Sequence, residues 1–370
     1  MKIIVHPLSE QSFNNDAYPF CLFVTQRCYQ LDSSKKIRVR LIASLIIGIL
    51  VLVCLVVWTG VSRLVMAISG ASPVWVIVAT SIIVPTYFLR ALRWKVLLIP
   101  IKDKIRFGNA YWCIALGFMI NTFIPIRLGE FARAYVLGER EKLGFASCFS
   151  SIVVERTLDL IGLLTLGLSA LFILPTDLSS PSWVLDGFKA VAALICLILV
   201  IIGLGIKKEE FILKILHNTM SSTPLLNKYN DKILTFLKSF ISGLKGLSYS
   251  PKLFLTSIFL TSILWLAQCL AIYLTFKAFD QKVSITVIIL GSVTIQLTHI
   301  LPAAPGYLGS YEAFWTLIFG ALKVAQTDLL LAMGVVSHLA STTATLVLGS
   351  IGTAWLGLSL QRILRLKKED

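Results

Sequence analysis

The stretch Pro125-Ile126-Arg127-Leu128-Gly129-Glu130 and the later stretch Pro305-Gly306-Tyr307-Leu308-Gly309, followed by Glu312, are two copies of one pattern, Pro-x-x-Leu-Gly with a nearby Glu. Each copy interrupts a long apolar stretch, at about 107–137 and 284–323. Proline and glycine disfavour a continuous helix, and a carboxylate is costly in hydrocarbon. Paired broken segments in two halves of a chain are typical of the substrate site of a transporter-like membrane protein. Structural breaks are expected at Pro125, Gly129, Pro305, Gly306 and Gly309.

Composition indicates an integral membrane protein. The chain has 370 residues, of which 56% are hydrophobic and only 14% charged, and its mean hydropathy is +0.84. A soluble domain has about 25% charged residues. The net charge of +15 comes from Lys and Arg that lie mainly between the apolar runs, so membrane topology accounts for it and no nucleic-acid partner is predicted. The seven cysteines are scattered, so neither a metal site nor a cofactor is predicted.

The apolar runs predict an all-α integral membrane protein with about six full spans. A helix needs about 20 apolar residues to cross a bilayer. Runs of this kind lie at roughly 41–59, 72–92, 148–175, 184–206, 252–277 and 328–357. The two broken stretches add two re-entrant helical hairpins, in which the chain enters the membrane and returns to the same side. Irregular backbone is tolerated at that depth only where it is buried in protein or lines a cavity.

Basic residues predict the orientation, because Lys and Arg accumulate on the cytoplasmic side of a membrane. One basic cluster precedes the first span, a second follows the second span, and a third follows the first broken motif. The third cluster stays on the side of the second only if the first broken stretch turns back. The two hairpins then enter from opposite faces as an inverted repeat, a common basis for alternating access. The alternative is a bundle of eight conventional spans.

This topology divides the chain into regions. Residues 1–34 are expected to form a disordered cytoplasmic extension, residues 35–357 the transmembrane domain, and residues 358–370 a basic cytoplasmic tail. Within the domain, the loop 207–251 predicts an amphipathic cytoplasmic helix, which either lies on the lipid surface or covers the end of the bundle. The protein is therefore expected to be a multi-pass protein of the cell (inner or cytoplasmic) membrane, with both termini in the cytoplasm.

Ionisable residues near the broken motifs are the candidate substrate-binding residues. Each would cost about 3 kcal/mol at the bilayer centre, so they must pair, lie near an interface, or face water. They are Arg127, Glu130, Arg133, Glu155, Arg156, Asp159 and Glu312. Tyr307, beside the second break, is a further candidate for the wall of a headgroup pocket.

Helical spacing offers local ion pairs within this set. Three pairs are three residues apart: Arg127–Glu130, Glu130–Arg133 and Arg156–Asp159. Glu155 and Asp159 share a helix face and need a cation between them, for which Arg127 or Arg133 is available. A structural ion-pair network is one interpretation of the set, and direct contact with a headgroup or a proton is the other.

Arginine suits a phosphate headgroup, because its planar fork binds two phosphate oxygens at once. Helix N-termini beside the breaks add N–H donors. Glu312 has no cation near it in the sequence, so it is expected either to be protonated or to pair with an arginine of the first hairpin. Interfacial anchoring accounts for Arg90, Arg93 and Trp94, and hydrogen bonding within helices accounts for His299 and His338.

Four ordered motifs run along the chain: Arg90-Ala-Leu-Arg93-Trp94, Ile124-Pro-Ile-Arg-Leu-Gly-Glu-Phe-Ala-Arg133, Val154-Glu-Arg-Thr-Leu-Asp159 and Pro305-Gly-Tyr-Leu-Gly-Ser-Tyr-Glu312. Together they resemble the lysylphosphatidylglycerol synthase transmembrane (flippase-like) family over roughly 40–357. The resemblance implies a bundle that moves lipids with charged headgroups between leaflets. Aminoacylated phosphatidylglycerol and polyprenyl-phosphate-linked sugars are the substrate types that it implies.

The expected function is therefore a membrane lipid flippase or translocase for a lipid with a charged or phosphate-containing headgroup. The synthases carry a soluble aminoacyl-transferase domain after the membrane part, whereas this chain ends at Asp370 soon after its last span, so no enzymatic activity is expected. A separate lipid-modifying enzyme is a candidate partner. One alternative is a membrane-embedded transferase or hydrolase that acts on a lipid-linked substrate through Glu130, Asp159 or Glu312. The other is a non-transporting partner of a lipid-modifying enzyme.

Overall fold

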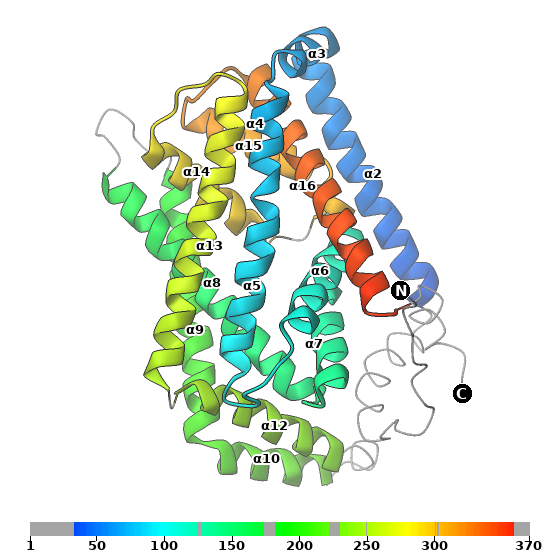
Figure 1. Ribbon diagram of the computed structural model, residues 1–370, viewed down its shortest axis with the longest axis vertical. Helices are drawn as coiled ribbons and strands as arrows, with labels where there is room; N and C mark the ends of the chain where they lie inside the picture. Colours follow the sequence, from blue (N-terminus) through cyan, green and yellow to red (C-terminus); the bar gives the residue numbers. More distant parts are fainter. Residues whose placement is uncertain are drawn as a thin grey trace, which may run out of the picture.

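The expected all-α fold is confirmed. The computed structural model describes residues 33–124, 127–173, 182–221, 230–248, 250–299, 301 and 303–358, and these ranges contain helices and no strand. Figure 1 shows the helices as a bundle. The expected break at Pro125 lies outside the described residues, as do nearly all of the extension 1–34 and of the tail 358–370.

Among the described residues, six stretches are long and apolar enough to span a membrane, if one bent pair of helices counts as a single span. They coincide with the six predicted apolar runs. In the bent pair the two helix axes meet at 88°. The stretches are α2 (Ser33–Thr59) with α3 (Val61–Ser69), α4 (Pro73–Ser81) with α5 (Ile83–Leu98), α8 (Phe145–Ile173), α9 (Ser182–Lys207), α13 (Pro251–Ala278) and α16 (Thr327–Trp355).

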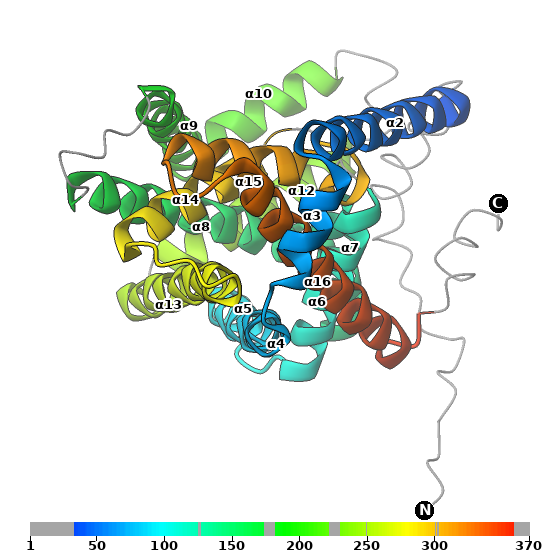
Figure 2. The ribbon, with the colours of Figure 1, turned by 90° about the horizontal axis from the view of Figure 1, so that it is seen from above.

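Helices α2 and α9 lie at two edges of the bundle when it is seen from above (Figure 2). Both expose large apolar side chains, for example Ile47 at 61% and Val200 at 55%. Exposed apolar side chains along a whole helix are what a lipid-facing helix requires, because the hydrocarbon core accepts them without cost. Fully buried Trp94 and Trp315 belong to two separate apolar cores inside the bundle.

Each broken stretch forms two short helices, one on either side of the break. The first consists of α6 (Phe107–Phe123) and α7 (Leu128–Glu141), and the second of α14 (Ile285–Thr298), the 3₁₀ turn η1 (Pro305–Tyr307) and α15 (Ser310–Ala321). All four α-helices have 17 residues or fewer, below the length of about 20 that a full span needs. In Figure 1 the first pair lies in the lower half of the bundle and the second in the upper half. Entry of the two pairs from opposite membrane faces stays a prediction.

A glycine of each motif lies against the backbone of another helix. Gly129 is helical and packs on Gly117 of α6, where an added Cβ would lie 2.8 Å from the Gly129 carbonyl oxygen. Gly309 has a φ of 74° and packs on Gly48 of α2. Any larger side chain at either position would push two helices apart. Gly129 therefore contributes to helix packing rather than to the break itself, whereas Gly306, with a φ of 66°, lies inside the second turn.

The loop 207–251 forms two helices, α10 (Glu209–Ser221) and α12 (Asn230–Ser248), which lie together at one end of the bundle (Figure 1). On α12, Ile241 and Leu244 are buried, and the helix packs against α8. Lys245 of α12 forms an ion pair with Glu209 of α10. The apolar side of α12 thus covers the bundle, which is one of the two interpretations of its sequence. Its cytoplasmic location stays a prediction.

Candidate functional site

A buried cluster of charged side chains joins three helices. Glu155 and Asp159 lie one turn apart on α8, and Arg93 of α5 lies between them. Nη1 of Arg93 is 2.6 Å from Oδ1 of Asp159, and Nη2 is 3.1 Å from Oε1 of Glu155. Arg93 also donates to the hydroxyl of Thr261 on α13 at 2.8 Å. The Arg93 and Glu155 side chains are fully buried, so the cluster is sealed from solvent on this side.

Two further arginines complete the cluster. Arg133 of α7 donates to Oε2 of Glu155 at 3.0 Å, and its guanidinium lies 4.8 Å from the ring centre of Trp94. Arg156 lies 2.5 Å from Glu155 and 3.1 Å from Asp159, and its Nε is 3.7 Å from Oε1 of Glu130 on α7. The three arginines thus balance three carboxylates. Arg156 and Glu130 are the most accessible members described, with 29% and 18% of their side chains exposed, and they form the open edge of the cluster.

The predicted local pairs are partly confirmed. Arg156 pairs with Asp159 as expected, and Arg133 supplies a cation to Glu155. Arg127 bonds the His299 carbonyl instead of a carboxylate of this cluster. The predicted pairs Arg127–Glu130 and Glu130–Arg133 are absent among the described residues, so those two predictions were wrong. The reason is that Glu130 pairs with Arg156 of the neighbouring helix α8 instead of with its own helix.

Arg93 was missed by the sequence reasoning, which assigned it to an interface. That interpretation was wrong, because Arg93 is fully buried and its guanidinium bonds side chains of α8 and α13. The signal available was the apolar continuation Trp94, Val96, Leu97 and Leu98 after Arg93. Arg90, one turn earlier, lies with its guanidinium 5.0 Å from the ring centre of Phe118 and 5.8 Å from that of Trp265.

The two broken motifs meet through their turns. Arg127, whose φ of 51° places it in the left-handed region, donates from Nη2 to the carbonyl oxygen of His299 at 2.5 Å. The hydroxyl of Tyr307 donates to the same oxygen at 3.2 Å. A Cβ added at Gly306 would lie 3.6 Å from the carbonyl oxygen of Thr122, so the backbones of the two turns are also adjacent.

Glu312 lies apart from these arginines. Its Oε1 is 2.7 Å from Nδ1 of His338 on α16, and both side chains are buried. The expectation that Glu312 pairs with an arginine of the first broken stretch was therefore wrong, because Glu312 is paired with His338 of the adjacent helix α16. His338 is hydrogen-bonded, as expected. Oε2 of Glu312 has no hydrogen-bond partner within the described part of the chain. The Tyr311 ring covers His338, with ring centres 4.7 Å apart.

Arginines take up the carboxylates at the centre of the cluster. Both oxygens of Glu155 and both of Asp159 lie against arginines, so none of these four oxygens is left without a partner. The described residues contain no group of three His, Cys, Asp or Glu placed to hold a metal ion. Arginines at the open edge and at the turn are the groups that a phosphate would meet.

Comparison with known proteins identifies the family. Residues 45–349 match the family described as the lysylphosphatidylglycerol synthase TM region. Glycosyltransferase AglD of Haloferax volcanii is 24% identical over 85% of this chain, which spans only 54% of that protein. A UPF0104 membrane protein of Methanothermobacter thermautotrophicus is 26% identical over 82% of this chain and 93% of its own length, and UPF0104 membrane protein MJ1595 of Methanocaldococcus jannaschii is 24% identical over 83% and 92%.

No solved structure matches the chain. The match to the family covers both broken motifs and the whole buried charge cluster. It agrees with the resemblance carried by the four sequence motifs, and with the long apolar helices. The chain is a multi-pass membrane protein that belongs to the lysylphosphatidylglycerol synthase transmembrane-region family.

Proposed function

We propose that this protein is a flippase that moves a lipid with a charged or phosphate-containing headgroup between the leaflets of the membrane. The observation that carries the proposal is the contact between the two broken stretches, in which Arg127 of the first bonds the His299 carbonyl of the second. Glu130, three residues after Arg127, reaches the buried arginine cluster through Arg156. Broken helices that meet inside a bundle are the usual location of substrate sites in transporters.

Arg127 and Arg156 are the proposed phosphate ligands. A guanidinium has five N–H donors, and Arg127 uses one of them on His299. The Arg156 side chain is 29% accessible, and its Nε is a buried donor that lies 3.7 Å from Oε1 of Glu130 and has no hydrogen-bond partner among the described residues. Arg133, Glu155 and Asp159 hold Arg156 in place. Glu130 competes with the headgroup for Arg156, and that competition allows release.

The second motif completes the proposed site. Tyr307 lines it through the hydroxyl that already bonds the His299 carbonyl, and Glu312 fixes α15 to α16 through His338. If the hairpins enter from opposite faces, separating the turns opens the site to one side of the membrane and then to the other. Both termini are proposed to lie in the cytoplasm, and the membrane to be the cell (inner) membrane.

The substrate class follows from charge and from the family. The family is named for a synthase of lysylphosphatidylglycerol, a lipid. An arginine-rich site accepts phosphate on such a lipid, so aminoacylated phosphatidylglycerol or a polyprenyl-phosphate-linked sugar is the proposed cargo. A lipid-modifying enzyme on a separate chain is a proposed partner that would supply the cargo.

A liposome assay tests the proposal. Purified protein in liposomes that contain a fluorescent anionic phospholipid is expected to speed the loss of protection from a membrane-impermeant quencher. Arg127→Ala is expected to slow this movement about tenfold or more, because a charge-assisted hydrogen bond contributes about 1.5–3 kcal/mol. Lys189→Ala, an exposed position on α9, is the matched control. Wild-type movement no faster than in empty liposomes overturns the function, and an unchanged rate in a folded Arg127→Ala variant overturns the arginine assignment.

A membrane-embedded transferase is the second candidate, favoured by the name glycosyltransferase of the relative AglD. The role would need a free base, and Glu130 at the open edge is the most accessible carboxylate of the cluster. Mass spectrometry of lipids incubated with the purified protein distinguishes the two. A chemically altered lipid that depends on the protein supports the transferase, and unaltered lipid that changes leaflet supports the flippase.

A further inference from the structure

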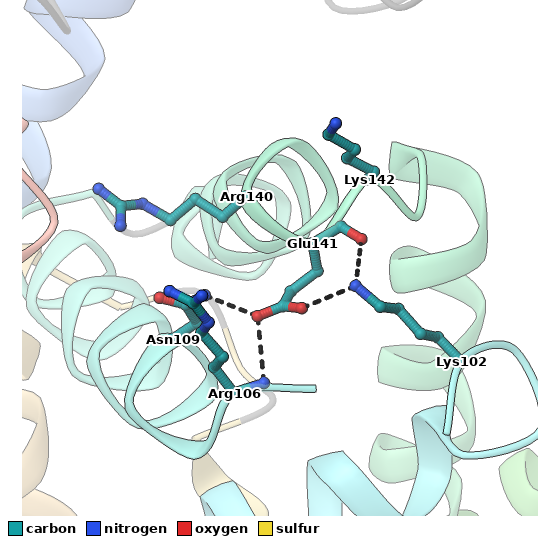
Figure 3. Close-up of a pocket in the computed structure, with 6 residues that line it drawn as sticks. All are labelled: Lys102, Arg106, Asn109, Arg140, Glu141 and Lys142. Carbon is teal, nitrogen blue, oxygen red and sulfur yellow. Dashed lines mark hydrogen bonds and ion pairs between the residues drawn. The ribbon is translucent and has the colours of Figure 1, made fainter. Parts of the chain in front are cut away.

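We propose that a second anion-binding site, separate from the turns, lies at the base of the first hairpin and takes a phosphate group. The site is a hollow of about 300 Å³ where the loop before α6 meets the end of α7 (Figure 3). This volume is near the lower limit of about 300–1,000 Å³ for small-molecule sites. Its lining residues are Lys102, Arg106, Asn109, Arg140, Glu141 and Lys142.

Glu141 organises the hollow. Its Oε1 accepts from Nδ2 of Asn109 at 2.6 Å and from the backbone N–H of Arg106 at 3.2 Å. Its Oε2 lies 2.9 Å from Nζ of Lys102, which also donates to the Glu141 carbonyl at 2.8 Å. The Glu141 side chain is only 5% exposed. These bonds fix the start of α6, the end of α7 and the preceding loop as one wall.

The cations that remain exceed this one carboxylate. Arg106 and Lys142 are exposed, and their side chains have no hydrogen-bond or ion-pair partner in the described part of the chain. Figure 3 shows Arg140 and Lys142 leaving α7 on different sides of Glu141. Arg140 bonds the Leu356 carbonyl and lies 5.9 Å from the Trp355 ring centre. Four cations against one anion leave the hollow with a formal excess of positive charge.

The lining determines the class of ligand. All six residues are polar or charged, so an acyl chain or another apolar group finds no surface there. Arginine and lysine side chains line this hollow together, and a phosphate accepts several charge-assisted hydrogen bonds from such groups. The helix dipole favours cations at a helix C-terminus, and membrane topology favours them on one side of the membrane. Neither tendency explains why these cations line one hollow around a buried glutamate.

The phosphate has two possible sources, an anionic lipid headgroup of the adjacent leaflet or free phosphate in solution. The full-length protein in phosphatidylcholine nanodiscs is titrated with inorganic phosphate by calorimetry. In parallel, native mass spectrometry counts the phosphatidylglycerol that the protein retains from mixed phosphatidylglycerol–phosphatidylcholine nanodiscs. Binding in the first arm identifies free phosphate as a ligand, and retention in the second identifies the headgroup.

The double variant Arg106→Gln/Lys142→Gln tests the location. Both side chains are exposed and have no partner among the residues that the structure describes, so the variant is expected to fold, which size-exclusion chromatography checks. It is expected to bind at least about tenfold more weakly in whichever arm is positive, because it removes two charge-assisted hydrogen-bond donors. Lys207→Gln/Lys208→Gln removes two exposed charges at the end of α9 and is expected to leave binding unchanged.

The outcomes are decisive in both directions. Binding in at least one arm that falls in the hollow variant but not in the control variant supports the site. No binding by the wild-type protein in either arm overturns it, and so does equal binding by all three proteins. The site does not depend on the proposed transport, since the Arg127→Ala variant is expected to keep this binding while it loses lipid movement.

Discussion

Nη1 of Arg93 lies 2.6 Å from Oδ1 of Asp159, although 66 residues separate them in the chain. Both side chains are buried, and the same guanidinium also reaches Glu155 on α8 and Thr261 on α13. One side chain of α5 therefore fixes three helices at the level of the charge cluster. A buried cation with three polar partners is costly to disturb, because its removal leaves carboxylates desolvated without compensation.

Replacing Arg93 by alanine is expected to destabilise the protein by about 3–5 kcal/mol, the usual cost of removing one partner from a buried ion pair. Thermal unfolding of the purified protein in detergent measures the change. Arg63→Ala, at an exposed position on α3, is the control and is expected to change little. Equal unfolding temperatures for Arg93→Ala and the wild type would show that the cluster does not hold the helices together.

Substituting Gly129 by alanine is expected to cost about 1–3 kcal/mol, because the new methyl group would collide with the Gly117 backbone and separate α6 from α7. Gly203→Ala on α9 is the matched control, since a Cβ there meets no atom within 4 Å. Alanine has the higher helix propensity, so the control is expected to be neutral or slightly stabilising. Unfolding of both variants in the same detergent compares them, and similar changes in both would contradict the close contact.

Removing His338 is expected to destabilise the protein by about 1–3 kcal/mol. His338→Ala takes away the partner of Oε1 of Glu312, whose Oε2 already has none among the described residues. Glu312→Gln keeps an acceptor facing His338 and is expected to lose less. Intrinsic fluorescence during heating follows both variants. A larger loss in Glu312→Gln than in His338→Ala would reverse the assignment.

Acidification is expected to weaken the contact between the start of α6 and the end of α7. Burial by itself would raise the pKa of Glu141, but hydrogen bonds from Asn109, Lys102 and the Arg106 backbone outweigh it and hold the pKa below its ordinary value. A carboxylate with a lowered pKa in the folded state stabilises the fold above its unfolded pKa, near about 4.3. That contribution is lost as the pH falls through the folded pKa.

The test of this pH dependence is the unfolding temperature of wild type and Glu141→Gln between neutral pH and about pH 3, a range chosen to cross the ordinary carboxyl pKa. The wild type is expected to lose more stability on acidification than the variant, which has no proton to gain at this position. Parallel curves for the two proteins would exclude Glu141 as the group responsible.

Much of the fold could be predicted from the sequence, because apolar runs and helix breakers act locally. The six spans and the two pairs of short helices correspond to runs of apolar residues and to Pro–Gly interruptions. The sequence also predicted that several residues of the charged cluster would pair, because an unpaired charge in an apolar segment is costly. These residues are Arg133, Glu155, Arg156 and Asp159.

Their partners were less predictable, because pairing depends on how helices pack. Arg93 meets α8 only after α5 and α8 are placed side by side, and Glu312 meets His338 across two helices rather than an arginine of the first hairpin. Such placement depends on close contacts like that of Gly129 with Gly117, which no spacing along one helix reveals. Helical periodicity predicts which residues of one helix are neighbours, but it does not predict contacts between residues of different helices.

The carbonyl oxygen of His299 accepts two hydrogen bonds, one from Arg127 and one from the Tyr307 hydroxyl. If Arg127 turns toward an anion, as the proposed transport requires, the Tyr307 hydroxyl still donates to that oxygen, so the acceptor keeps a partner. Separating the two broken motifs at this point would therefore cost less than breaking a buried hydrogen bond whose acceptor has no second donor. A carbonyl oxygen that keeps a second donor makes this contact between the two broken motifs easy to break and easy to form again.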